Sequence, residues 1–263
     1  MMEVLYERPK SLQNKGFGYC PGCLHGVVDK LICELVDEMG WQDDLMCVLP
    51  IGCGTMLMFA MDFDGIVSAH GRAPAVATGV KRNKPERPVI VKQGDGDLAA
   101  IGTAEIIHAA NRGENFTVIF VNNGIYGMTG GQMAPTTLPG QKASTAISGR
   151  SIAETGYPMH MCELISQLTA PKFVMRTAVD SPANIRKTRA AIKKGFEIQM
   201  SEEGGFSFIE ILSNCPTNWG LSPADTIKWI REKSMAEFPL GVYKDVTADN
   251  GDDAAARNVK KEV

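Results

Sequence analysis

The chain has 263 residues, of which 44% are hydrophobic and 22% charged, and its formal net charge is −3. This composition is ordinary for a globular protein with a sizeable core, built as one large α/β domain or two small ones. The negative charge and the lack of a basic run argue against nucleic acid as a partner. Residues 1–16 lack the apolar stretch of a signal peptide, and the nearly apolar run 48–61 is shorter than the ~20 residues that a membrane span needs. We therefore expect a cytoplasmic protein with no membrane partner.

Alternating helices and strands are expected along the chain. The spacing of apolar residues predicts helices at 27–39, 72–82, 98–112, 182–199 and 222–237, and strands at 45–49, 89–91, 116–121, 172–178 and 205–212. Pro223 directly after Ser222 is typical of a capped helix start. The alternation favours an α/β fold in which helices flank a mostly parallel central sheet on both faces.

The domain organisation is expected to be simple. Residues 1–240 should form one domain, and residues 241–263 a polar tail that is read equally well as an arm toward a partner or as disordered chain. The loop 130–150 is rich in Gly, Thr, Ser and Pro, and its length suggests a function.

Two polar turns follow consecutive expected strands. The first is Gly94-Asp95-Gly96-Asp97, and the second contains Asn123, which lies 123 − 95 = 28 positions after Asp95. A β-loop-α-β unit brings both turns to the carboxyl edge of adjacent parallel strands, where open α/β sheets bind ligands. Glycines allow a ligand to approach closely, a helix start favours negative charge, and carboxylate and amide oxygens suit Mg²⁺. The pair of turns indicates a diphosphate held through a divalent cation, although Gly-Asp-Gly alone would be read as an ordinary tight turn.

The seven cysteines form no regular disulfide framework, and clustered cysteines in a cytoplasmic enzyme more often bind metal or carry redox chemistry. The motif from Cys20 to Cys23 is compatible with a thioredoxin-like redox pair, a structural zinc site or an iron–sulfur cluster. The residues before it, 15–18, do not read as a strand, which argues against the redox pair. Further zinc ligands could come from His25, Cys53 or Cys215. The motif alone leaves zinc and iron–sulfur both open.

The spacing of Gly-Asp-Gly and Asn-Asn resembles the signature of thiamine diphosphate enzymes. The loop 122–132, NNGIYGMTGGQ, narrows this to a resemblance to the β subunit of the 2-oxoacid:ferredoxin oxidoreductases, which extends over nearly the whole chain. The resemblance implies that Asp95, Asn123 and the Ile125 carbonyl hold Mg²⁺. The residues implied to contact thiamine diphosphate are Ile51, Gly52, Cys53, Gly54, His70, Gly94, Gly96, Asp97, Gly127 and Met128.

The same resemblance selects an iron–sulfur cluster over zinc. It implies one [4Fe–4S] cluster in this subunit, held by Cys20, Cys23, Cys53 and Cys215. The other three cysteines stand at apolar helix or strand positions and are expected to be buried: Cys33, Cys47 and Cys162. His25 should lie near the cluster, where it either tunes the cluster potential or simply packs.

The resemblance also implies partners and a reaction. The activating glutamate belongs to the pyrimidine-binding domain of an α subunit, so no catalytic residue is assigned in this chain, and γ and ferredoxin-like δ subunits complete the assembly. The implied reaction is coenzyme A-dependent oxidative decarboxylation of a 2-oxoacid to an acyl-CoA and CO₂. Electrons would pass through the cluster to ferredoxin.

Met56, three positions after Cys53, stands where family members that use 2-oxoglutarate often carry a basic residue. Because a buried carboxylate without a cation is costly, an apolar residue here favours branched-chain 2-oxoacids such as 2-oxoisovalerate. A 2-oxoglutarate enzyme remains the alternative, with the cation on the α subunit and Met56 in the core. Two further alternatives are a thiamine diphosphate decarboxylase with structural zinc and a non-catalytic iron–sulfur or zinc scaffold; intact Asp95 and Asn123 argue against the scaffold.

Overall fold

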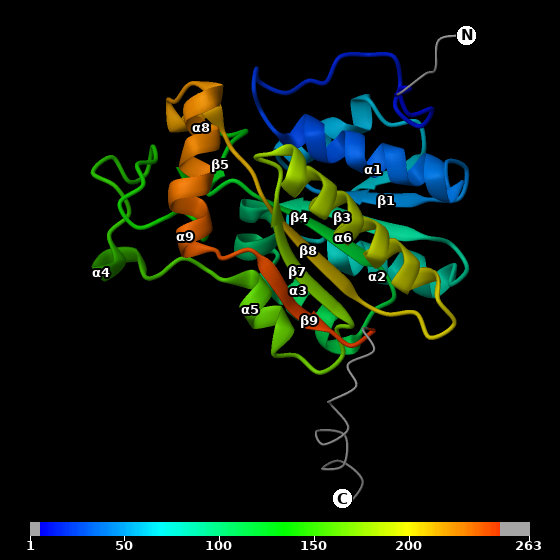
Figure 1. Ribbon diagram of the computed structural model, residues 1–263. Coiled ribbons are helices and arrows are strands. Elements are labelled where there is room, and N and C mark those ends of the chain that lie inside the picture. Colours follow the sequence, from blue (N-terminus) through cyan, green and yellow to red (C-terminus); the bar gives the residue numbers. More distant parts are fainter. Residues whose placement is uncertain (1–5, 248–263) are drawn as a thin grey trace, which may run out of the picture.

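The computed structural model describes residues 6–247 and is built on one sheet of seven strands (Figure 1). The strands are β1 (Met46–Leu49), β2 (Asp64–Val67), β3 (Val89–Gly94), β4 (Thr117–Asn122), β7 (Phe173–Ala178), β8 (Ser207–Leu212) and β9 (Gly241–Asp245). Their order across the sheet is β2-β1-β3-β4-β8-β7-β9. Neighbouring strands are parallel except for β7 and β9. The expected α/β fold with a mostly parallel sheet is confirmed.

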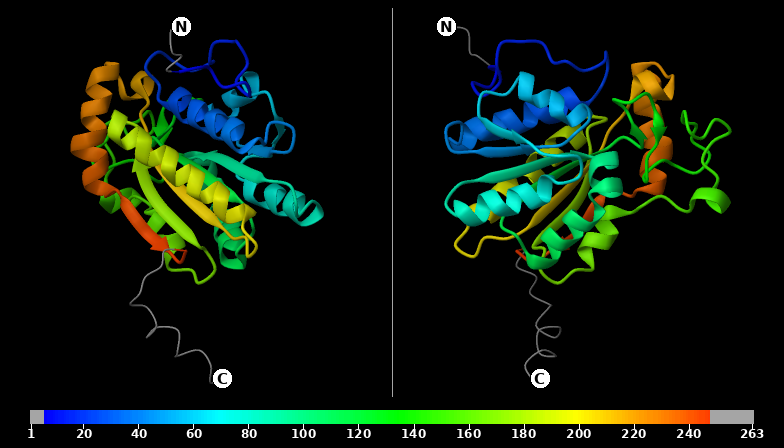
Figure 2. Two further views of the ribbon diagram at one scale, coloured as in Figure 1. Left: turned by 45° about the vertical axis from the view of Figure 1, so that its right-hand side comes forward. Right: turned by 180° about the vertical axis from the view of Figure 1, so that it is seen from behind.

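Helices cover both faces of this sheet (Figures 1 and 2). One face carries α1 (His25–Met39) and α6 (Pro182–Met200), which share a buried apolar cluster with β1, β4 and β8. The other face carries α2 (Ala73–Asn83), α3 (Thr103–Arg112) and α5 (Met161–Ser166), which pack on the alternate residues of the strands. Because successive strand residues point to opposite faces, a sheet covered on both sides needs apolar residues throughout its central strands.

The remaining elements are short. They are η1 (Cys53–Phe59), β5 (Ile125–Tyr126), β6 (Gln132–Met133), α4 (Ile152–Thr155), α7 (Pro216–Trp219), α8 (Pro223–Trp229), η3 (Ile230–Ser234) and α9 (Met235–Glu237). The expected cap is present, since the Ser222 side chain accepts a hydrogen bond from the Asp225 N–H at the start of α8. No helix within residues 6–247 is long and apolar enough to cross a membrane.

The expected helix 98–112 is divided in two. A π-helical turn, η2 (Asp97–Ile101), precedes α3, and Gly102 lies between them. The backbone of Gly71 packs directly against Gly102: a Cβ on Gly102 would lie 2.6 Å from the Gly71 carbonyl oxygen. This close approach needs glycine, and π-helical turns are frequent at functional sites. Apolar spacing could not predict the break, because the contact joins residues 31 positions apart (102 − 71).

The sheet continues past the expected domain boundary at residue 240. Residues 241–245 form β9, which pairs antiparallel with β7. The first part of the expected tail therefore belongs to the sheet edge. The rest of that tail, 248–263, lies outside the described residues.

Candidate functional site

The two polar turns meet at one edge of the sheet, as expected. β3 and β4 are parallel neighbours, with Gly94 opposite Val121. Asp95 and Asn123 therefore leave the sheet side by side, and both side chains accept a hydrogen bond from the Ile125 N–H, at 3.2 and 3.3 Å. A carboxylate oxygen and an amide oxygen are thus gathered around one short turn.

The Asp95 carboxylate is buried, with only 3% of the residue exposed. Burial raises its pKa to about 6, against the opposing hydrogen bonds from the Thr136 hydroxyl and the backbone N–H groups of Gly96, Gly124 and Ile125. No ion pair found within residues 6–247 involves this carboxylate. A buried carboxylate without a cation is unfavourable, so the turn fits a divalent ion that oxygen ligands hold.

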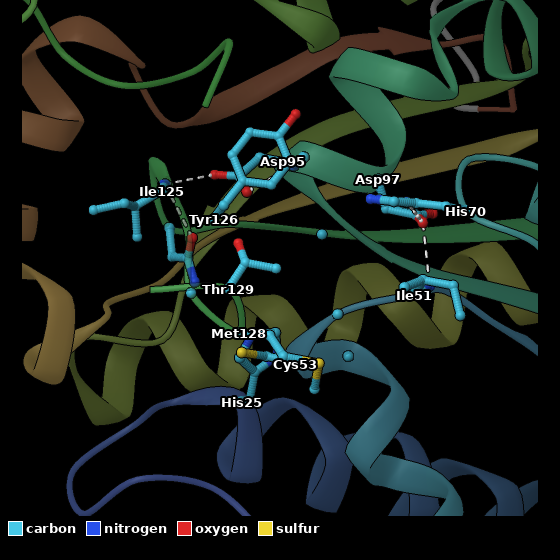
Figure 3. A pocket seen from close by; sticks show the side chains of 16 residues that line it. His25, Ile51, Cys53, His70, Asp95, Asp97, Ile125, Tyr126, Met128 and Thr129 are labelled. Carbon is cyan, nitrogen blue, oxygen red and sulfur yellow. Dashed lines mark hydrogen bonds and ion pairs between the residues drawn. The ribbon is translucent and has the colours of Figure 1, made fainter. Parts of the chain in front are cut away.

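A cavity opens beside these turns (Figure 3). Every residue assigned from the sequence to thiamine diphosphate and its Mg²⁺ lines this cavity: Ile51, Gly52, Cys53, Gly54, His70, Gly94, Asp95, Gly96, Asp97, Asn123, Ile125, Gly127 and Met128. Three further lining residues were not predicted as contacts, namely His25, Tyr126 and Thr129. Cys53, Met128 and His25 lie together at one end of the cavity in Figure 3.

Asp97 organises one wall of this cavity. Its Oδ1 accepts hydrogen bonds from the backbone N–H groups of Ile51 and Gly71, at 3.1 and 2.9 Å, and lies 2.5 Å from His70 Nδ1. Its Oδ2 accepts a hydrogen bond from Gln93 Nε2 at 2.6 Å. Hydrogen bonds from the chain itself therefore hold the Asp97 carboxylate in place, and it positions the 51–54 turn and His70.

The four cysteines assigned to a cluster line a second cavity of about 300 Å³. They come from the loop before α1, from η1 and from the residue that precedes α7: Cys20, Cys23, Cys53 and Cys215. Since a water molecule occupies about 30 Å³ in the liquid, the space exceeds what one ion needs. Within residues 6–247, no three His, Cys, Asp or Glu side chains converge on a single-ion site. Burial raises the thiol pKa to about 12 at Cys23 and about 11 at Cys53.

The other three cysteines are fully buried in the apolar clusters, as expected: Cys33, Cys47 and Cys162. Met56 lines the cysteine cavity and not the coenzyme cavity. The two cavities adjoin, because five residues line both: His25, Cys53, Asn123, Gly127 and Met128.

Comparisons with known proteins agree with this architecture. Residues 51–211 match the family described as thiamine pyrophosphate enzyme, C-terminal TPP binding domain. The 2-oxoglutarate synthase subunit KorB of Methanocaldococcus jannaschii is 39% identical over 223 residues, which are 82% of this chain and 78% of that protein. The chain belongs to the 2-oxoacid:ferredoxin oxidoreductase family.

Other members of this family differ in length. The ketoisovalerate oxidoreductase subunit VorA of Methanothermobacter thermautotrophicus is 45% identical over 245 residues, or 93% of this chain, but the chain spans only 51% of that protein. A solved structure of 2-oxoglutarate:ferredoxin oxidoreductase from Magnetococcus marinus, with 2-oxoglutarate, coenzyme A and succinyl-CoA bound, superposes with a TM-score of 0.75 at 26% identity. That match covers 94% of this chain and 87% of the other.

Two polar residues of this family member support the site from outside the sequence motifs. The Thr136 hydroxyl donates to Asp95 Oδ2 at 2.9 Å, and the Thr137 hydroxyl donates to the Gly124 carbonyl oxygen at 2.6 Å. Both lie in the loop 130–150, whose length and composition were the only signal in the sequence.

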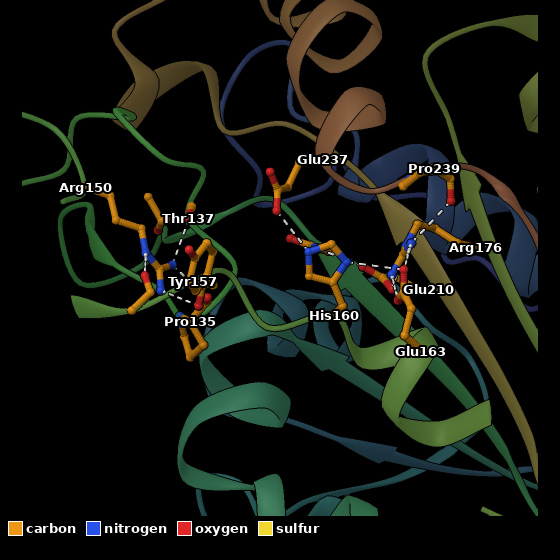
Figure 4. Close-up of polar contacts among 12 residues, drawn as sticks. Pro135, Thr137, Arg150, Tyr157, His160, Glu163, Arg176, Glu210, Glu237 and Pro239 are labelled. Carbon is orange, nitrogen blue, oxygen red and sulfur yellow. Dashed lines mark hydrogen bonds and ion pairs between the residues drawn. The ribbon is translucent and has the colours of Figure 1, made fainter. Parts of the chain in front are cut away.

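Arg150 fixes this loop. Its guanidinium donates hydrogen bonds to main-chain carbonyl oxygens on both sides of the loop (Figure 4). The six accepting residues are Ala134, Pro135, Thr137, Thr155, Gly156 and Tyr157. Three of the acceptors flank Thr136 closely in sequence, so Arg150 positions the hydroxyl that binds Asp95.

Proposed function

We propose that this chain is the coenzyme- and cluster-binding subunit of a 2-oxoacid:ferredoxin oxidoreductase that converts a 2-oxoacid and coenzyme A to an acyl-CoA and CO₂. The observation that carries the proposal is the shared wall between the motif-lined cavity and the four-thiol cavity. When bound, thiamine diphosphate supplies the carbanion chemistry and a [4Fe–4S] cluster takes the electrons on toward ferredoxin. Adjoining cavities would keep these two groups close together.

The chain's own residues divide into holding and positioning roles. Asp95, Asn123 and the Ile125 carbonyl would hold Mg²⁺, and Gly94 leaves room for the diphosphate beside it, since no atom lies within 4 Å of a Cβ placed there. The buried Asp95 carboxylate supports this role because no cationic side chain of residues 6–247 pairs with it. Gly96 is proposed as a further coenzyme contact, and its lack of a side chain makes room for the ring of Tyr126. The further coenzyme contacts proposed for the cavity wall are Ile51, Gly52, Cys53, Gly54, His70, Asp97, Gly127 and Met128.

The proposed cluster ligands are Cys20, Cys23, Cys53 and Cys215. Their common cavity and its volume support a group of several atoms rather than one zinc ion. Replacing Cys215 with Ala should deplete iron and acid-labile sulfide and bleach the protein, whereas Cys47→Ala should leave iron near the wild-type amount. Loss of iron from Cys47→Ala with retention in Cys215→Ala would reject this ligand set.

The subunit is proposed to be inactive alone. No glutamate of residues 6–247 lines the coenzyme cavity, so the activating glutamate would come from an α subunit, with γ and ferredoxin-like δ subunits completing a cytoplasmic complex. The isolated chain should not oxidise a 2-oxoacid until an α-type subunit is added. Turnover by the purified single chain, free of other subunits by mass spectrometry, would overturn this part.

The proposed substrate is a branched-chain 2-oxoacid such as 2-oxoisovalerate. The 45% identity to a ketoisovalerate oxidoreductase subunit supports it. The apolar Met56 lies in the cysteine cavity, which adjoins the coenzyme cavity. The 39% identity to a 2-oxoglutarate synthase subunit supports 2-oxoglutarate as the second candidate. Anaerobic kcat/KM values of the native complex for both acids decide between them. An apolar pocket should favour 2-oxoisovalerate by tenfold or more, since ~1.4 kcal/mol is tenfold in rate, and Met56→Lys should narrow that preference.

Asp95→Ala provides the central test of the function. Loss of a cation ligand at the strand edge should abolish both turnover and Mg²⁺–thiamine diphosphate binding by calorimetry, with an unchanged far-UV circular dichroism spectrum. Asp43→Ala, which removes an exposed carboxylate, is the matched control and should bind normally. Full activity and normal coenzyme affinity in Asp95→Ala would reject the assignment.

A further inference from the structure

One asparagine joins the two cavities. Asn218 lies on α7, the short helix that begins directly after the candidate ligand Cys215. Its side chain lines the cysteine cavity. Its Nδ2 donates hydrogen bonds to the Gly127 carbonyl oxygen at 2.8 Å and to Cys215 Sγ at 3.2 Å. A carboxamide nitrogen has two N–H groups, so both bonds form together. Both neighbours are acceptors, which fixes the orientation of the amide with its nitrogen toward them.

We propose that Asn218 is a positioning residue that raises the reduction potential of the cluster, because its side chain donates a hydrogen bond to Cys215 Sγ and is anchored to the coenzyme loop at Gly127. The inference rests on the proposed function. Asn218 is not one of the proposed cluster ligands, and it would link the cluster to the loop at Gly127 beside the coenzyme.

The local packing confines this amide. A Cβ on Gly131 would lie 3.0 Å from Asn218 Oδ1, and a Cβ on Gly127 would lie 3.1 Å from Cys53 Sγ and 3.5 Å from Cys215 Sγ. The backbone of the loop 127–131 therefore lies close to the Asn218 amide and to the thiols of Cys53 and Cys215. Trp219 Nε1 donates a second hydrogen bond from α7, to the Asn123 carbonyl oxygen at 3.2 Å. Because this bond does not involve Asn218, α7 should keep its position when the Asn218 side chain is changed.

The hydrogen bond acts on the charge of the sulfur. The Asn218 amide donates to Cys215 Sγ at 3.2 Å, and a hydrogen-bond donor at this distance favours negative charge on the sulfur. A cluster gains negative charge on reduction, part of which falls on the thiolates, so a donor here stabilises the reduced form. Cys23 Sγ, in contrast, accepts from the main chain of His25, which no side-chain substitution at His25 removes.

The test uses the native complex, purified anaerobically, in a redox titration followed by electron paramagnetic resonance. Asn218→Leu keeps the volume and removes the donor. Its cluster midpoint should become more negative by the equivalent of a tenfold change in the one-electron equilibrium, about 59 mV, with iron and sulfide unchanged. Asn218→Ala should shift the midpoint in the same direction. Thr217→Val is the matched control, since it removes a polar group from the same cavity, and its midpoint should stay at the wild-type value.

The outcomes separate this inference from the proposed function. A wild-type complex that contains no iron or acid-labile sulfide would contradict the proposed function itself. An unchanged or more positive midpoint in both Asn218 variants overturns the inference and leaves the function standing. An equal shift of the midpoint in Thr217→Val would assign the effect to the general polarity of the cavity and would also overturn the inference. Loss of iron from both Asn218 variants, with retention in Thr217→Val, makes Asn218 a structural residue and likewise overturns the inference.

Discussion

Among residues 6–247, each face of the central sheet carries one ion pair that is fully buried. On the face of α1 and α6, Lys92 of β3 pairs with Asp29 of α1. On the face of α5, Arg176 of β7 pairs with Glu210 of β8. All four side chains have no exposed surface. The two pairs look alike by charge and burial, but they differ in how they connect to water and to the candidate site.

The Lys92 pair is closed in the sense that no third charged side chain of residues 6–247 joins it. Lys92 Nζ donates to Tyr19 Oη at 3.2 Å and to the Gly54 carbonyl oxygen at 3.3 Å, and Tyr19 Oη donates to Asp29 at 2.5 Å. Tyr19 directly precedes one candidate cluster cysteine, and Gly54 directly follows another. The ammonium group thus holds two cysteine segments against the sheet.

The Arg176 pair is open at one end. The guanidinium also binds Glu163 (Figure 4), whose side chain is 37% exposed. It donates a further hydrogen bond to the Tyr243 hydroxyl. The second Glu210 oxygen accepts a hydrogen bond from Asn122 at 2.8 Å, one residue before the candidate Mg²⁺ ligand. This network has several members and reaches water. The loss of stability on removing one charge should therefore depend on which groups remain beside its partner.

The largest effect is expected at the closed pair. Lys92→Met leaves the Asp29 carboxylate buried without a cation and should lower the free energy of unfolding by ~3–5 kcal/mol in a urea titration. The double variant Lys92→Met/Asp29→Leu removes both charges and should lose less than the single one. A single variant as stable as the double variant would show that the ion pair does not govern this face.

A smaller effect, tied to pH, is expected at the open end. Burial raises the pKa of Glu163, but the hydrogen bond and charge of Arg176 outweigh burial and hold that pKa at about 2, below the reference 4.5. A lowered carboxyl pKa contributes stability that is present above the unfolded-state pKa and is lost as the pH falls through the folded-state pKa. Glu163→Gln should therefore be less stable than wild type at pH 6, and the difference should shrink between pH 4.5 and 2. A constant difference over that range would contradict the linkage.

The smallest effect is expected at a surface pair with no role in either network. Lys228 and Glu232 lie 4.0 Å apart on one helical face, with side chains 70% and 57% exposed. Lys228→Ala should change the free energy of unfolding by less than about 0.5 kcal/mol, because exposed pairs are screened by water and salt. If Lys228→Ala lost as much free energy of unfolding as Lys92→Met in the same urea titration, burial would not explain the difference in stability effect between the pairs.

The sequence predicted the parts of the site that are local in the chain. Gly94 to Asp97 and Asn123 stand at the ends of strands whose apolar runs are easily recognised, and parallel pairing then brings them together. The spacing of the cysteines required a family resemblance, because four thiols spread over 196 positions (215 − 20 + 1) carry no local signal.

The sequence did not predict the supporting contacts. Lys92 binds Asp29 across 63 positions and Arg176 binds Glu210 across 34. A charged residue in a strand is ordinarily read as a solvent-facing one, and only the tertiary fold reveals its partner. The short edge strands β2 and β9 were missed for a related reason. All residues of β2 are exposed and those of β9 are exposed or partly buried, so neither has the continuous apolar run of a central strand.

The hydrogen bonds from Arg150 to main-chain carbonyl oxygens bear on the thermodynamics of ligand binding. A long irregular loop normally holds much conformational entropy, and ordering it on binding subtracts from affinity. Here one guanidinium already ties residues 134–137 to residues 155–157. The chain therefore meets that entropic cost during folding and not at the moment of ligand capture. Peptide carbonyls do not titrate, so this preorganisation should hold at any pH at which the sheet itself is folded.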